Sequence, residues 1–101
     1  MDPVVVSILE FSGDPDEIGQ KMASVEEVAS RKAGEYGGIS STLVKTDDGL
    51  MMINMWSTEE GRHQMADDPE IREAIQGAGM APPNAKGYEV IKHRTPEHAS
   101  A

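Results

Sequence analysis

The residues most suited to chemistry in this chain are an amide and an indole two positions apart, Asn54 and Trp56, within an otherwise apolar segment. Residues at this spacing in a strand point to the same face. The amide could therefore orient an oxygen atom of a bound molecule while the indole stacks on its ring. The alternative is a core tryptophan beside a hydrogen-bonded asparagine. The binding interpretation gains weight because a polar amide in so apolar a strand requires a partner.

Three further side chains could serve the same site. Ser7 is the sole polar residue of an apolar N-terminal segment, and it could face the same cavity or simply bond within the sheet. His63 could accept a proton from a bound molecule because histidine titrates near neutral pH, although a solvated histidine among charged neighbours is the simpler account. Arg62 could pair with an anionic substrate, or contact Glu59 three residues earlier.

Several kinds of catalytic or metal site are excluded by what the sequence lacks. It contains no cysteine, which removes disulfides, thiolate nucleophiles and cysteine metal sites together. It has no H-E-x-x-H or G-x-S-x-G motif and no phosphate-cradling glycine loop. His63, Asp67 and Asp68 offer two or three ligands without a defined fourth, so we expect no metal site.

The length and charge of the chain set its broad class. Its 101 residues make one domain, and 18 acidic against 9 basic residues leave a formal net charge of −9. This charge argues against nucleic-acid binding and against docking on an anionic membrane, since both need a basic face. We find neither a signal-peptide pattern nor an apolar run long enough to span a membrane. We therefore expect a small acidic protein of the cytoplasm, where a cysteine-free chain needs no oxidising environment.

Periodicity and capping signals predict the elements that must hold these residues. Residues 4–11 are apolar at both odd and even positions, as in a strand buried on both faces. Asp14 as an N-cap, followed by apolar residues at three- and four-residue steps, predicts a long amphipathic helix that the glycine pair at 37–38 ends. Residues 39–46 alternate with serine and threonine, which is typical of a more exposed strand.

The second half of the chain repeats this order. An acidic turn signal leads to a strand at 50–56, again apolar at both parities. A capping box that starts at Ser57 opens a second helix, which a break at 68–69 interrupts and restarts. A long connection over 77–87 then precedes a last strand at 88–93.

The resulting order β-α-β-β-α-β predicts an α+β protein with a ferredoxin-like fold, a four-stranded antiparallel sheet with its helices on one face. Residues 1–94 form this domain, and 95–101 are predicted to be a flexible C-terminal tail. The strands at 4–11 and 50–56 are apolar on both faces, so something must also cover the helix-free side. The simplest candidate is a second copy, and we predict a homodimer formed through the sheet face. The sequence leaves open which parity faces the helices.

With these elements in place, the chain resembles the dimeric α/β-barrel superfamily, and within it the antibiotic biosynthesis monooxygenase-like domains. The resemblance lies in the opening strand at 4–10, the glycine turn at 37–39, the M-W-S-T-E-E run at 55–60 and the D-D-P sequence at 67–69. It covers residues 3–93. The superfamily includes oxygenases, heme degraders, cyclases and plain ligand binders, so it does not specify one activity.

The resemblance implies a dimer with one pocket per subunit between sheet and helices, where an electron-rich phenol, anthrone or quinol binds. The site assists deprotonation of the substrate, whose anion itself reduces dioxygen, so no flavin, heme or metal is required. Heme-degrading relatives carry a histidine on the helix after the proline, and residues 69–78 contain none. This chemistry needs an apolar cavity, an aromatic wall and hydrogen-bond donors aimed at developing oxyanions.

We therefore predict a cofactor-independent monooxygenase that oxidises an electron-rich aromatic of the polyketide type with dioxygen. The catalytic candidates are Asn54, Trp56 and His63. The substrate-contacting candidates are Ser7, Leu9, Met52, Met65 and Arg62. Two alternatives on the same fold stay open: a non-catalytic dimeric binder of a small apolar ligand, and a biosynthetic cyclase or isomerase.

Overall fold

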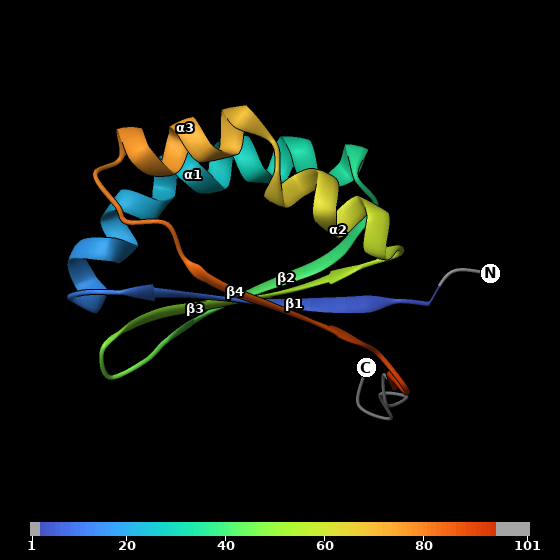
Figure 1. Cartoon of the computed structure of the whole chain (residues 1–101). Coiled ribbons are helices and arrows are strands. Elements are labelled where there is room, and N and C mark those ends of the chain that lie inside the picture. Colours follow the sequence, from blue (N-terminus) through green and yellow to red (C-terminus); the bar gives the residue numbers. More distant parts are fainter. Residues whose placement is uncertain (1–2, 95–101) are drawn as a thin grey trace, which may run out of the picture.

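The computed structural model describes residues 3–94, and the predicted tail at 95–101 lies outside them. The described residues form one sheet with a layer of helices on one side (Figure 1). The elements in chain order are β1 (Val5–Ser12), α1 (Pro15–Glu35), β2 (Gly38–Lys45), β3 (Gly49–Trp56), α2 (Glu59–Ala66), α3 (Pro69–Gly77) and β4 (Asn84–Glu89).

The sheet has the strand order β2-β3-β1-β4, and all neighbouring strands are antiparallel. This order confirms the predicted α+β ferredoxin-like fold. The two central strands are β1 and β3, whose register pairs Val5 with Trp56 and Ser7 with Asn54. The apolar character predicted for both parities of these strands therefore belongs to the middle of the sheet, while the edge strand β2 is largely exposed, as expected.

The start of α2 differs from the predicted capping box. Thr58, not Ser57, is the N-cap, and its hydroxyl accepts a hydrogen bond from the Gly61 N–H at 2.9 Å. Ser57 still belongs to the end of the sheet, because its N–H donates to the Gly37 carbonyl at 2.9 Å. The other predicted cap is confirmed: Asp14 accepts from the Glu17 N–H at 3.0 Å.

The predicted last strand lies too far toward the C-terminus. β4 spans Asn84–Glu89 rather than 88–93, and it pairs with β1 so that Leu9 lies opposite Ala85. The residues that were assigned to a long connection therefore supply most of this strand. All six residues of β4 are exposed, and an exposed edge strand needs no apolar pattern, so its sequence is typical of a loop.

The core lies between the helices and one face of the sheet. Its buried members come from β1, α1 and β3: Phe11, Ile18, Met22, Val25, Leu50 and Met52. The apolar residues of α1 follow the predicted three- and four-residue steps, and α3 packs against the same cluster through Ala74 and Ile75. Among the described residues, no helix has the length and apolar character needed to cross a membrane.

Within residues 3–94, the opposite face of the sheet carries no helix (Figure 1). We call it the open face, and its apolar residues on β1, β2 and β3 are Val6, Ile8, Val44, Met51, Ile53 and Met55, all partly exposed. Tyr88 of β4, paired with Val6, is 51% exposed beside them. The parity left open by the sequence is thus decided: odd positions of β1 and even positions of β3 face the helices.

Candidate functional site

Three of the predicted site residues meet on the helix-facing side of the two central strands. Ser7 of β1 and Asn54 of β3 are direct cross-strand partners, and Trp56 lies two residues farther along β3. They are 4%, 8% and 3% exposed, respectively. The shared face predicted for Asn54 and Trp56 is therefore confirmed, and Ser7 lies on the same face.

A hydrogen bond joins two of these side chains. The indole Nε1–H of Trp56 donates to the Ser7 hydroxyl oxygen at 3.0 Å, which fixes the plane of the indole ring against the sheet. Within residues 3–94 the Asn54 amide makes no side-chain hydrogen bond, yet no polar side-chain atom of that part of the chain is both sealed from solvent and unpartnered. The Asn54 amide thus keeps access to solvent and remains available to a ligand.

Ser7 and Asn54 belong to a row of small or polar residues that crosses the whole sheet under the helices, and Trp56 lies in the neighbouring row. The register places Gly87 of β4 beside Ser7, Ser7 beside Asn54, and Asn54 beside Ser41 of β2. The next row toward the core is apolar and contains Leu9 and Met52. A polar row beside a buried indole can hold an aromatic molecule that carries oxygen atoms.

Arg62 of α2 extends this row at the β4 end. A Cβ built on Gly87 would lie 2.6 Å from Arg62 Cζ and 2.7 Å from its Nε, so the guanidinium rests directly on the glycine. The Arg62 side chain is 16% exposed, and its Nε donates to Glu59 Oε1 at 3.0 Å. This hydrogen bond lowers the pKa of Glu59. The predicted contact between Arg62 and Glu59 is thus present.

His63 lies outside this group. Its side chain is 63% exposed, and its Nε2 lies 2.9 Å from the same Glu59 oxygen that Arg62 uses. His63 is therefore a solvent-exposed histidine among charged neighbours, which is the simpler of the two interpretations of this residue given above. No contact of His63 with Asn54 or Trp56 is found in the described part of the chain.

The three apolar candidates occupy different environments. Met52 is 8% exposed and belongs to the buried core, and Leu9 packs against that core. Met65 of α2 is half-buried. Leu9 and Met52 therefore form an apolar surface next to the polar row. Met65 does not belong to this surface.

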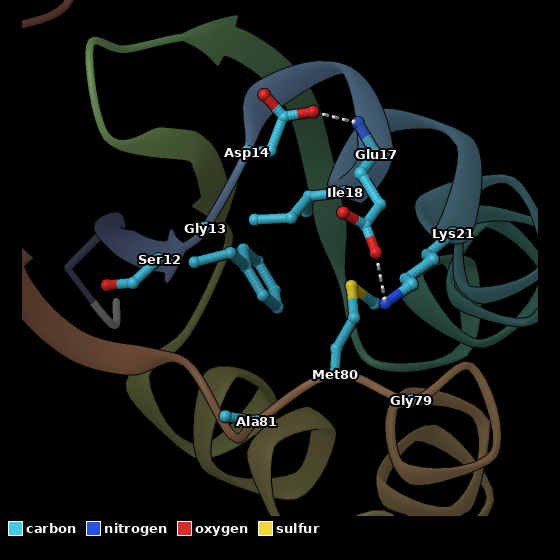
Figure 2. A pocket seen from close by; sticks show the side chains of 10 residues that line it. Ser12, Gly13, Asp14, Glu17, Ile18, Lys21, Gly79, Met80 and Ala81 are labelled. Carbon is cyan, nitrogen blue, oxygen red and sulfur yellow. Dashed lines mark hydrogen bonds and ion pairs between the residues drawn. The ribbon is translucent and has the colours of Figure 1, made fainter.

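A small cavity lies at the other end of β1. Its volume is about 130 Å³, and its wall includes Phe11, Ile18 and Met80. Figure 2 shows Ile18 and Met80 at this cavity, beside the ion pair between Glu17 and Lys21, whose atoms are 3.2 Å apart. Phe11 is four residues from Ser7 along β1, or about 13 Å. A second hollow of about 510 Å³ lies at the β1 start, near Val4 and Ile91, and neither of these two hollows is lined by Asn54.

Sequence reasoning missed a buried carboxylate at Asp68. It caps α3 through the N–H groups of Glu70 and Ile71, accepts a hydrogen bond from the Tyr36 hydroxyl at 2.6 Å, and lies 3.2 Å from Lys32 Nζ. The Tyr36 hydrogen bond is the largest cause that lowers the pKa of Asp68 to about 2. The Asp68-Pro69 pair signalled the cap, but nothing local signalled its partners on α1.

The carboxylates of Asp67 and Asp68 both make contacts that stabilise the helices. Asp68 faces α1, and Asp67 pairs with Arg72 at 3.1 Å. Within residues 3–94, no three His, Asp or Glu side chains lie close enough together to hold a metal ion.

Comparison with known proteins identifies the fold through solved structures of low sequence identity. No family model matches the sequence, and no curated protein is significantly similar to it. Among solved structures, SnoaB, a cofactor-independent oxygenase from Streptomyces nogalater, is 16% identical with a TM-score of 0.63, over 96% of this chain and 100% of that one. The ActVA-Orf6 monooxygenase of Streptomyces coelicolor, solved with the ligand nanaomycin D, is 17% identical with a TM-score of 0.67, over 95% and 94% of the two chains.

A dimeric ferredoxin-like protein from an uncultured marine organism is also similar, at 12% identity and a TM-score of 0.65, over 96% of this chain and 95% of that one. The chain therefore has the fold of the antibiotic biosynthesis monooxygenase-like proteins. At these identities the likeness shows the fold alone.

Proposed function

We propose that this protein, which shares its fold with cofactor-independent oxygenases, binds an electron-rich phenol, anthrone or quinol at the polar row and promotes its oxidation by dioxygen. The observation that carries the proposal is the group formed by Ser7, Asn54 and Trp56. It sets a buried indole, fixed by a hydrogen bond, beside an amide that has no side-chain hydrogen bond within residues 3–94.

The chemistry assigned to these residues is modest. The Asn54 amide N–H donates to the substrate oxygen on which negative charge develops, and a hydrogen bond to the charged form lowers the pKa of the substrate. The substrate gives its proton to solvent water, and the resulting anion transfers an electron to dioxygen and then combines with the reduced oxygen. For an anthrone, the ring CH₂ becomes a carbonyl, one oxygen atom enters the product and the other leaves as water with the two hydrogens.

A non-catalytic binder is the second candidate, and the position of His63 favours it. His63 is the only histidine among the catalytic candidates, and it is exposed and paired with Glu59 rather than turned to Asn54. A site without a base can bind an aromatic molecule without turning it over. A binder would take up the ligand and form no product.

We also propose that a second copy of the chain covers the open face. Its apolar residues are partly covered by their neighbours in the sheet, and no helix formed by residues 3–94 lies over them. Burying such a patch against an identical patch about a two-fold axis is the simplest closed arrangement.

Oxygen consumption tests the catalytic proposal. We expect chelator-treated protein to consume dioxygen above the autoxidation rate with at least one member of a panel of anthrones and quinols. Asn54→Ala should lower this rate by about 100-fold, as loss of one oxyanion donor does. Asn84→Ala, the same substitution at an exposed position of β4, is the matched control and should retain the rate.

Each failure has its own meaning. No uptake across the panel, with a ligand still bound, would move the assignment to the binder. Uptake that survives Asn54→Ala would show that the site lies elsewhere.

A further inference from the structure

The guanidinium of Arg62 lies against Gly87 at the β4 end of the polar row, and it fits there because Gly87 has no side chain. Its Nη1 lies 3.0 Å from the position that a Gly87 Cβ would take, on the face shared with Ser7. A β4 residue with a side chain would push the guanidinium away. Gly87 thus leaves the space that the Arg62 guanidinium occupies.

The donors of Arg62 are only partly used. Nε and Nη2 both bond to Glu59 Oε1, and His63 Nε2 approaches the same oxygen. Within residues 3–94, no acceptor is found for Nη1. An arginine that is 16% exposed and keeps one end unpaired next to a ligand row is suited to an incoming anion, because guanidinium binds carboxylates in a planar, two-point geometry.

The distance between Arg62 and Asn54 along the polar row determines how far apart two polar groups of a bound ligand must lie. Gly87 and Asn54 flank Ser7 on neighbouring strands, so their backbones are about 10 Å apart at the usual interstrand spacing. A fused aromatic ring system reaches across this distance. Of the three helix-facing residues of β4, Ala85 and Gly87 are small and exposed, so the Arg62 end of the row is open to solvent, and the third, Glu89, lies opposite Val5 beyond the row.

We infer that Arg62 is a specificity-determining residue that binds an acidic group of the substrate, so that the site takes a fused-ring aromatic acid with a hydroxyl or carbonyl at its opposite end. The acidic group pairs with Nη1 over Gly87, and the distal oxygen reaches Asn54. This inference rests on the proposed location of the site, but it does not require turnover. In a chain with a net charge of −9, such a group is needed to hold an anion against general repulsion.

Two probes that differ by one carboxylate test the inference, 6-hydroxy-2-naphthoate and 2-naphthol. Their affinities are measured at pH 7 by calorimetry and by quenching of Trp56, the only tryptophan of the chain. We expect the acid to bind about tenfold more tightly than the alcohol, and Arg62→Gln to abolish this difference. Arg72→Gln removes the same charge at an exposed position of α3 and should keep the preference.

Two further variants separate binding from structure. Gly87→Ala keeps the charge but displaces the guanidinium, and it should also abolish the preference. Glu59→Gln frees Arg62 from its internal partner and should tighten binding of the acid, whereas Glu60→Gln, an exposed neighbour, should not. If Arg62 only braced α2, Glu59→Gln would leave acid binding unchanged.

The outcomes are distinguishable from those of the proposed function. Equal affinities for the two probes, or a preference that survives Arg62→Gln, would overturn the inference. Binding of neither probe would count against the site, and hence against both proposals. Acid preference without any dioxygen uptake would leave the inference standing and favour the binder.

Discussion

The bond between Trp56 and Ser7 joins two side chains that are 49 residues apart in the sequence and almost fully buried. Each residue taken alone had a plain structural explanation. Their contact places the indole and the hydroxyl next to Asn54 on the helix-facing side of the sheet. The proposed site rests on this arrangement.

Replacing Ser7 by alanine tests the bond. The indole N–H would lose its acceptor inside the protein, and we expect the free energy of unfolding to fall by about 1–3 kcal/mol. Urea unfolding measures this change, with Ser40→Ala on the exposed strand β2 as the control, expected to stay within about 0.5 kcal/mol of wild type.

A double-mutant cycle with Trp56→Phe completes this test. If the bond is formed, the second substitution should add less than its own effect, because the partner is already lost. Additive effects would show that the two side chains act independently.

At the level of the elements, the helix layer depends on one buried carboxylate. Asp68 ends the loop after α2, begins α3 and reaches Tyr36 and Lys32 of α1, so a single side chain connects the helices that cover the sheet. Arg31 and Glu70 add a second link between α1 and α3 at 2.7 Å. The Asp68 N–H also donates to the Met65 carbonyl at the end of α2, at 3.2 Å.

Acid should weaken this connection in a defined range. The pKa of Asp68 is lowered from 3.8 to about 2, so the stability that its charge contributes is fully present above pH 3.8 and is lost as the pH falls toward 2. We expect Asp68→Asn, which can still cap α3, to be less stable than wild type near neutral pH and to lose less stability over this acid range.

Thermal unfolding between pH 6 and pH 2 measures the effect. Asp67→Asn changes an exposed neighbour and should follow the wild-type curve. Parallel curves for Asp68→Asn and wild type would show that the Asp68 charge contributes nothing to folding.

At the level of the whole molecule, the helices of the described residues cover the sheet on one side only. The open face presents apolar side chains from three strands, in an acidic chain that otherwise exposes mostly polar groups. The similar dimeric ferredoxin-like protein shows that this fold can pair, but the pairing of the present chain remains a proposal.

A charge at the centre of the open face tests the proposed homodimer. Ile53→Lys would place an unpaired ammonium in the interface from each copy, and an uncompensated buried charge costs about 3–5 kcal/mol. We expect sedimentation equilibrium to show a dimer for wild type and a monomer for this variant. Gln64→Lys adds the same charge on exposed α2 and should remain dimeric. A monomeric wild type would refute the homodimer.

Much of the fold was predictable because its signals are local. Alternation, helical periodicity, the Asp14 cap and the glycine turn at Gly37 each depend on neighbours in the chain, and together they specify the order of strands and helices. The same-face relation of Asn54 and Trp56 also follows from strand geometry alone. Where the local signal was absent, in the exposed strand β4, the prediction was wrong.

The remaining features depend on contacts between residues far apart in the sequence. Tertiary packing alone decided which parity of β1 and β3 faces the helices, because both parities are apolar and either would have satisfied the pattern. It also placed Ser7 under Trp56, seated Arg62 on Gly87, and gave Asp68 its partners on α1. Each of these requires the sheet and the helix layer to be assembled first, since the bonding partner lies on another element and no spacing within one element encodes it.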